Sequence, residues 1–279
     1  LLAGCGGQEQ VGEEDPPVTP SPDAGGTEDE ITCVEPPVSA LFRIVDGAED
    51  GRLLLAALDE ADSGGVFSLN LCETAVWMDG ELADAAVLED GMAIRVTWDD
   101  NILETYPAQL SGVRSIEAWS LGTAQDPGGG FYDLCGFYLK VLDDLWQRDP
   151  GMNEGVAVAG LDLSNAPGGL TESEKQAIAW RFGELHGVDV ITGNFEEYYT
   201  AVDLGAEEGP ALYQWTDGCL FTIEPYAADT GENYSLPVLH FDASKWRGPW
   251  AVYGFSDCSA VWPELGTWSE YSIGAEFIS

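Results

Sequence analysis

Two residues near the C-terminal end have the types and spacing for acid–base chemistry. His240 and Asp242 alternate in a strand-like run, so both side chains point to one side and could act as a general-base pair. A catalytic triad would also need a nucleophile, and the spacing selects neither Ser244 nor Ser256. These residues therefore supply only part of an active site, and whether the protein is an enzyme stays open.

The segment 245–250 (KWRGPW) holds two of the chain's ten basic residues. The planar Arg247 guanidinium suits carboxylates, and tryptophan offers a stacking face. An acidic or sugar ligand could use these groups, which makes the following residues the candidate ligand-binding set: Lys245, Trp246, Arg247 and Trp250. The alternative is structural, with Arg247 paired to a nearby carboxylate over a core tryptophan. The sequence favours this structural interpretation, because the ten tryptophans are spread from 77 to 268 without clustering.

No complete catalytic or metal-binding motif occurs in the sequence. It lacks G-x-S-x-G, G-x-x-x-x-G-K-[ST], H-E-x-x-H and C-x-x-C, and it has only two histidines. The stretch from Asp46 to Gly51 resembles the start of a calcium loop. Counted from Asp46, however, the third position is Ala48 and the twelfth is Ala57, where the loop needs oxygen ligands. We therefore expect no metal, no cofactor and no assignable catalytic residue.

The first five residues, Leu1–Cys5 (LLAGC), have the pattern of a lipobox. An apolar residue three positions before the cysteine and two small residues at the cleavage point allow a thiol to accept a diacylglyceryl group. We expect residues 1–4 to be a signal-peptide remnant and Cys5 to be the lipidation site. Two or three acyl chains suffice for stable anchoring. This pattern predicts a cell-membrane protein that faces the outside.

Residues 5–37 are predicted to be a lipidated acidic spacer. Between residues 6 and 37 there are nine Asp or Glu, several Pro-Pro and Gly-Gly pairs, and no Lys or Arg. Such a stretch has little apolar surface to bury against its backbone entropy. In the whole chain, 10 Lys and Arg face 50 Asp and Glu, for a net charge of −40. This excess excludes nucleic acid as a partner held through phosphates.

Five cysteines remain after Cys5, at 33, 72, 135, 219 and 258, and their pairing is open. An exported chain permits disulfides, and Cys219 and Cys258 lie in two strand-like segments of the same half. A bridge between them is one interpretation. Buried free thiols are the other.

Residues 38–122 are predicted to form a small β-barrel. The expected strands lie at 41–45, 52–58, 66–71, 92–98 and 115–121, with hairpin or turn signals at 79–80 and 90–91. Through 90–92 (DGM) and 103–109 (LETYPAQ), this half resembles the small OB-like domains of secreted Gram-positive lipoproteins. The resemblance implies an OB-like barrel, and residues 123–130 are expected to be a linker.

Residues 131–279 are predicted to form an α+β domain with helices on a mostly antiparallel sheet. A helix with one buried stripe, which includes Phe137, Tyr138 and Leu145, is expected over 131–149. A second helix begins at a capping box of Thr171 and Glu174 and ends at His186-Gly187, with Leu185 on its apolar face and His186 expected to contact its last carbonyls. Strands are expected at 156–163, 188–192, 219–224, 235–241, 250–255 and 271–278. This half is similar to the C-terminal regions of uncharacterised lipoproteins of anaerobic Gram-positive bacteria. The matching stretches are 144–146 (DLW), 162–164 (DLS), 170–175 (LTESEK), 217–221 (DGCLF), 245–248 (KWRG) and 278–279 (IS).

The sequence therefore favours a membrane-anchored extracytoplasmic protein that acts as a binding or interaction module, with a protein or glycan of the cell envelope as partner. A cell-envelope hydrolase acting on glycan or peptide is the alternative.

Overall fold

The computed structural model describes residues 36–59, 65–72, 74–121, 126–127, 131–193, 214–226, 238–263 and 267–279. The predicted lipidation site, nearly all of the acidic spacer and most of the expected linker at 123–130 lie outside the described residues. Contacts group Glu35–Ser279 into one compact unit. The described residues of this unit form two seven-stranded sheets.

The first sheet closes into a small barrel. Its strands are β1 (Val38–Asp46), β2 (Arg52–Ala57), β3 (Val66–Asn70), β4 (Ala75–Met78), β5 (Glu81–Ala83), β6 (Ala93–Leu103) and β7 (Ala108–Ala118), and a 3₁₀ turn, η1 (Ala85–Val87), follows β5. Five of them run in the order β3-β2-β1-β6-β7, and a parallel pairing of β3 with β7, between Phe67 and Ala108, closes the ring. The small β-barrel predicted from the sequence is confirmed.

The barrel interior is filled by the alternating apolar residues of its strands. Phe42 and Ile44 of β1 and Leu53 and Leu55 of β2 are fully buried. Strand β2 is buried on both faces after its first residue, because helix α3 (Glu172–His186) packs against its outer side. One hydrophobic core therefore continues from the barrel into the helical layer.

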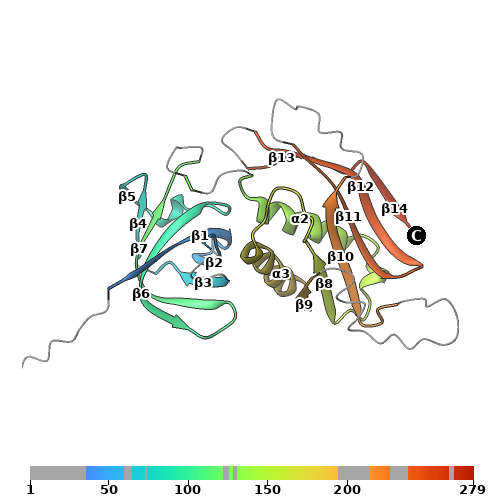
Figure 1. Ribbon diagram of the computed structural model, residues 1–279, viewed down its shortest axis with the longest axis horizontal. Helices are drawn as coiled ribbons and strands as arrows, with labels where there is room; N and C mark the ends of the chain where they lie inside the picture. The colour runs from blue at the N-terminus through green and yellow to red at the C-terminus, as the bar shows by residue number, and fades with distance from the viewer. Residues whose placement is uncertain are drawn as a thin grey trace, which may run out of the picture. The chain divides into compact units, whose positions relative to one another are not determined.

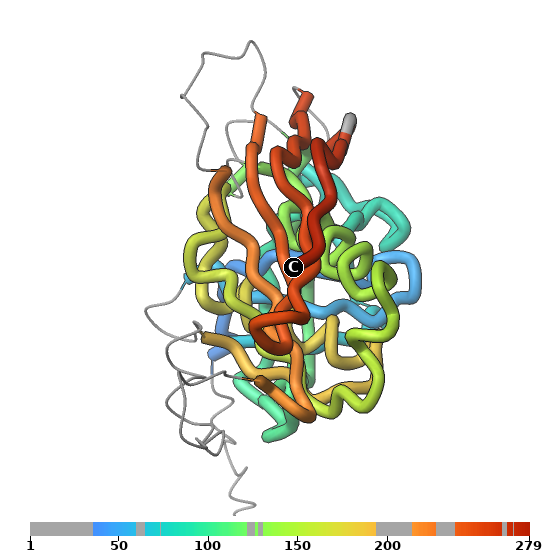
Figure 2. Tube along the Cα trace, turned by 90° about the vertical axis from the view of Figure 1, so that its right-hand side faces the viewer, coloured from blue at the N-terminus to red at the C-terminus, as the bar shows by residue number. Residues whose placement is uncertain are grey.

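The second sheet is mostly antiparallel. Its strands are β8 (Val158–Asp162), β9 (Asp189–Thr192), β10 (Gly218–Pro225), β11 (Val238–Gly248), β12 (Ala251–Val261), β13 (Ser269–Ser272) and β14 (Ala275–Ile278). They run in the order β13-β12-β11-β10-β8-β9, with β14 also on β12, and only the β10–β8 and β8–β9 pairs are parallel. Figure 2 shows β10, β11, β12 and β14 side by side, in orange and red. The predicted α+β class is confirmed.

One expected strand is interrupted. The sequence predicts a single strand over 271–278, whereas β13 ends at Ser272 and β14 begins at Ala275. A Cβ on Gly274 would lie 2.4 Å from the Asp257 carbonyl oxygen, so glycine is required where the chain passes this close. The prediction of one continuous strand was therefore wrong.

Two helices cover one face of this sheet (Figure 1). Helix α2 (Leu134–Gln147) buries its predicted stripe, which includes Phe137, Tyr138 and Leu145, and a 3₁₀ turn, η2 (Pro150–Asn153), follows it. Helix α3 connects β8 to β9, and because these two strands are parallel, β8, α3 and β9 form a βαβ unit.

Helix α3 begins and ends as the sequence predicts. Thr171 Oγ1 accepts a hydrogen bond from Glu174 N, and the Glu174 side chain accepts from Thr171 N, which completes the capping box. Gly187 ends the helix in the left-handed conformation. One detail of the prediction is wrong, because Leu185, expected on the apolar face, is 50% exposed.

The same helix contacts both sheets. Its first turn meets the barrel where Arg43 Nε donates to Glu174 Oε1 at 3.1 Å and Gly65 N donates to Ser173 Oγ at 2.9 Å. Farther along, Arg181 forms an ion pair with Asp46 at the end of β1. Its opposite side packs on β9 of the second sheet.

Candidate functional site

A groove lies between α3 and β9. The helix presents Gln176, Trp180 and Glu184 at intervals of four residues, which places them on one face. The chain reverses at Gly187 and returns along this face as β9. Helix and strand approach closely, since a Cβ on Gly183 would lie 2.8 Å from the Val188 carbonyl oxygen.

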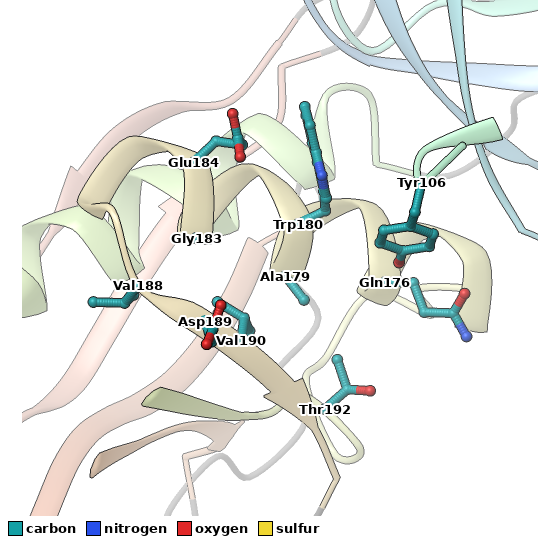
Figure 3. A pocket seen from close by; sticks show the side chains of 10 residues that line it. All are labelled: Tyr106, Gln176, Ala179, Trp180, Gly183, Glu184, Val188, Asp189, Val190 and Thr192. Carbon is teal, nitrogen blue, oxygen red and sulfur yellow. The ribbon is translucent and has the colours of Figure 1, made fainter. Parts of the chain in front are cut away.

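The groove encloses a cavity of about 560 Å³, within the range of ligand pockets. Ten residues line it, drawn as sticks in Figure 3: Tyr106, Gln176, Ala179, Trp180, Gly183, Glu184, Val188, Asp189, Val190 and Thr192. Four small or aliphatic residues supply the apolar part of the lining, and two aromatic and four polar side chains complete it.

The two ends of this groove differ chemically. Since α3 and β9 run in opposite directions, Gln176 near the start of the helix lies at the same end as Thr192, and Glu184 lies at the same end as Asp189 (Figure 3). One end thus offers an amide and a hydroxyl. The other end offers two exposed carboxylates.

The aromatic residue Tyr106 reaches the groove from the connection between β6 and β7. Its side chain lies over the Gln176 end of α3, with the hydroxyl directed towards the helix (Figure 3). The residue is 66% exposed, yet desolvation raises the pKa of its hydroxyl.

A smaller cavity of about 220 Å³ extends the groove beyond Gln176 and Thr192, which line both cavities. Its other lining residues include Ser164, Glu172 and Lys175. Lys175 Nζ lies 2.7 Å from Glu172 Oε1, so this ammonium is already paired within the helix. From Glu172 to Glu184 the helix rises by about 18 Å, which suits an extended ligand.

The predicted ligand residue Lys245 lies in the core instead. It is fully buried, and its ammonium donates to the carbonyl oxygens of Arg148 and of Asp149 (3.2 Å) and to Asn153 Oδ1 (3.0 Å). These acceptors follow the C-terminal end of α2, where a cation is favoured. Desolvation lowers the pKa of Lys245. These contacts agree with the structural interpretation of segment 245–250.

Arg247 also binds main-chain carbonyls. Its guanidinium donates to Met152 O (2.9 Å), Glu154 O (2.8 Å), Trp215 O (3.4 Å) and Thr216 O. The structural interpretation of this residue expected a carboxylate as its partner, so the kind of partner differs from the prediction. Arg247 ties the segment after α2 to the segment before β10.

The two tryptophans of the predicted set lie apart from the groove lining. Trp246 is half-buried and packs against Trp215 and Leu220. Trp250, in the turn between β11 and β12, is 82% exposed. Lys245 and Arg247 therefore both bind main-chain carbonyl oxygens. Of the four predicted ligand residues, Trp250 is the one that is largely exposed to solvent.

The two histidines have different surroundings. His240 and Asp242 lie on one face of β11 as the alternation predicts, but Asp242 Oδ1 accepts from Asp257 N of β12, at the point where the pairing of the two strands shifts register. His186 was expected to contact the last carbonyls of its helix. It instead stacks on Trp146 at 4.6 Å between ring centroids, and desolvation lowers its pKa.

The described cysteines are free thiols. Cys219 lies on β10 and Cys258 on β12, with β11 between them, so about two strand spacings, or roughly 10 Å, separate the strands. A disulfide requires Cα atoms within about 7 Å. The alternative of buried thiols is therefore the one observed at both positions.

Sequence reasoning missed the groove. Its residues come from α3, β9 and a barrel connection some 70 residues earlier, and no motif joins them. The capping box and the helix stop at Gly187 did predict α3, and the expected strand at 188–192 corresponds to β9, but nothing in the sequence indicated that the two enclose a groove. Among the described residues, no group of three or more His, Cys, Asp or Glu is placed to hold a metal.

Comparison with models of protein families, with curated proteins and with solved structures found no match. Within the described part of the chain, no helix is long and apolar enough to cross a membrane.

Proposed function

We propose that the protein is a lipid-anchored extracytoplasmic binding module that captures an envelope glycan in the α3–β9 groove. The lipobox at Leu1–Cys5 and the acidic spacer that follows support the anchoring. With the lipid on Cys5, the spacer would hold the compact unit away from the outer surface of the membrane.

The observation that carries the binding function is the groove itself. It combines a cavity of ligand size with the aromatic side chains Tyr106 and Trp180 and with amide, hydroxyl and carboxylate groups along both walls. Sugar rings have an apolar face that packs on aromatic rings and hydroxyls that bond to such polar groups. Nucleic acid is disfavoured by the charge of −40.

We further propose that the barrel is OB-like. Its third and fifth strands, β3 and β7, lie side by side and parallel, while the other barrel pairs are antiparallel. This order supports the five-stranded OB type. In this proposal the barrel supplies Tyr106 to the groove.

Calorimetry with the N-acetylglucosamine pentamer tests the binding function. We expect the full chain to bind it and Tyr106→Ala to weaken binding about tenfold, or about 1.4 kcal/mol. Trp250→Ala is the matched control, because it removes an exposed aromatic residue outside the groove lining. Loss of binding in the control alone would move the site to segment 245–250. Cleavage of the pentamer would show that the protein is a glycan hydrolase and not a binding module.

The anchor is tested separately by expression in a Gram-positive host. We expect the protein in the membrane fraction, with a mass increase of a diacylglyceryl group on the peptide that begins at Cys5. A Cys5→Ala variant should appear in the medium or stay unprocessed. An unmodified Cys5 thiol in membrane-free material would refute the anchoring.

A further inference from the structure

We propose that the groove selects a glycan with free amino groups, that is, a glucosamine-type polymer over its N-acetylated form. This inference rests on the proposed glycan binding and adds the charge of the ligand. It is carried by the charges along the α3–β9 groove.

Every charged side chain that lines the main cavity is acidic. Glu184 and Asp189 are both exposed at one end of the cavity, and the eight other lining residues are uncharged. The nearest basic residues in the helix are engaged, Lys175 with Glu172 and Arg181 with Asp46. An anionic ligand would meet repulsion here, whereas an ammonium group would be attracted.

The aromatic lining adds to the preference for a cation. An ammonium group near the face of a tryptophan or tyrosine gains a cation–π interaction, which an N-acetyl group cannot make. Trp180 lies between the carboxylate end and the end at Tyr106, so amino groups on successive sugars would meet both kinds of partner (Figure 3).

A glycan fits these features better than a basic peptide. The groove offers two ring-sized aromatic surfaces together with hydroxyl, amide and carboxylate groups, which match the ring face and substituents of a sugar. A lysine-rich peptide would need the carboxylates but would gain little from the Gln176 and Thr192 end.

The test compares the glucosamine pentamer with the N-acetylglucosamine pentamer in calorimetry on the full chain. We expect the amino form to bind about tenfold more tightly, and this advantage to shrink as salt screens the charges. The double variant Glu184→Gln/Asp189→Asn should lose the preference and bind the two pentamers with equal affinity.

A matched control separates the groove from the general negative charge of the chain. Asp50→Asn/Glu224→Gln removes two exposed carboxylates outside the groove, the same change in charge. We expect it to keep the preference. Loss of the preference in both double variants would overturn the inference, because non-specific attraction would then explain it.

The other outcomes distinguish the two proposals. Equal binding of the two pentamers overturns the amino-sugar inference and leaves glycan binding standing. Failure of both pentamers to bind overturns the proposed function and this inference with it. Tighter binding of a pentalysine peptide, lost in Glu184→Gln/Asp189→Asn, would replace the glycan by a basic peptide as the ligand. Circular dichroism of each variant checks that it is folded.

Discussion

Arg43 of the barrel and Glu174 of α3 form a buried ion pair, with Arg43 Nε 3.1 Å from Glu174 Oε1. The other carboxylate oxygen of Glu174, Oε2, accepts from Thr171 N at 2.8 Å and so completes the capping box. Arg43 also donates to Gly91 O at 2.9 Å. The Glu174 carboxylate thus caps the N-terminus of α3, the helix that lines the groove, and also joins this helix to the barrel.

Replacing Glu174 by alanine should strongly destabilise the protein. The change leaves the Arg43 charge buried without its carboxylate and removes a helix cap, which together should cost about 3–5 kcal/mol. Urea unfolding followed by tryptophan fluorescence measures the loss. Glu172→Ala, in the same helical turn, removes a surface ion pair with Lys175 and should cost less than about 1 kcal/mol. Similar losses in both variants would contradict the role of Glu174.

Asp133 should make stability fall as the pH rises. Burial raises its pKa to about 6, above the ordinary value of 3.8, although Gly136 N and Trp268 Nε1 donate to its carboxylate. The folded state therefore holds its proton more tightly than the unfolded state. Its contribution to stability is present below about pH 4 and is lost by about pH 6, a change of up to about 3 kcal/mol.

The Asp133→Asn variant isolates this effect, since asparagine also caps helices and does not titrate. We expect its free energy of unfolding to increase relative to that of the wild type by roughly 1–3 kcal/mol between about pH 4 and about pH 7. Urea unfolding across this range supplies the difference. A difference independent of pH would show that Asp133 does not titrate in this way.

Lys245→Met tests the structural role of the buried ammonium. Methionine keeps most of the side-chain volume but leaves the carbonyl oxygens of Arg148 and Asp149 without this donor, so we expect a loss of about 3 kcal/mol. Lys140→Met is the control, because Lys140 forms a surface pair with Asp144 and should cost less than about 1 kcal/mol. Unchanged stability in Lys245→Met would reopen a ligand-binding role for this residue.

The thiols should differ sharply in reactivity. Burial raises the pKa of Cys219 and Cys258 to about 12 and that of Cys135 well above its ordinary range, whereas Cys72 is exposed. In a chain with Cys5 and Cys33 changed to serine, one thiol per molecule should react rapidly with a colorimetric disulfide reagent. The other three should react only in denaturant. Rapid reaction of two or more thiols in native protein would be inconsistent with this burial.

Local patterns predicted the elements well because their determinants lie close together in sequence. The Thr171 and Glu174 capping box and Gly187 set both ends of α3 within about one residue of the prediction. The Asp79-Gly80 signal corresponds to the turn between β4 and β5, where both residues have positive φ. Residues 131–133 of the expected first helix are not helical, because Asp133 caps α2 with its own backbone in the left-handed region.

Long-range relationships were not predictable from one sequence. The β3–β7 pairing that closes the barrel joins segments about 40 residues apart, and no composition signal marks it. The same holds for Tyr106, which lines one cavity together with Gln176 although 70 residues separate them in the sequence. Arg247 was recognised as unusual, but its four carbonyl acceptors lie in segments that no side-chain pattern identifies.

Closure of the barrel also limits self-association. In the described residues, the first sheet ends at β5, a strand of three residues that follows a tight turn. An edge strand that short has few unpaired amide and carbonyl groups with which a strand of a neighbouring molecule could pair. Molecules gathered at high local density would therefore find little in the edge of this first sheet through which to join into fibres.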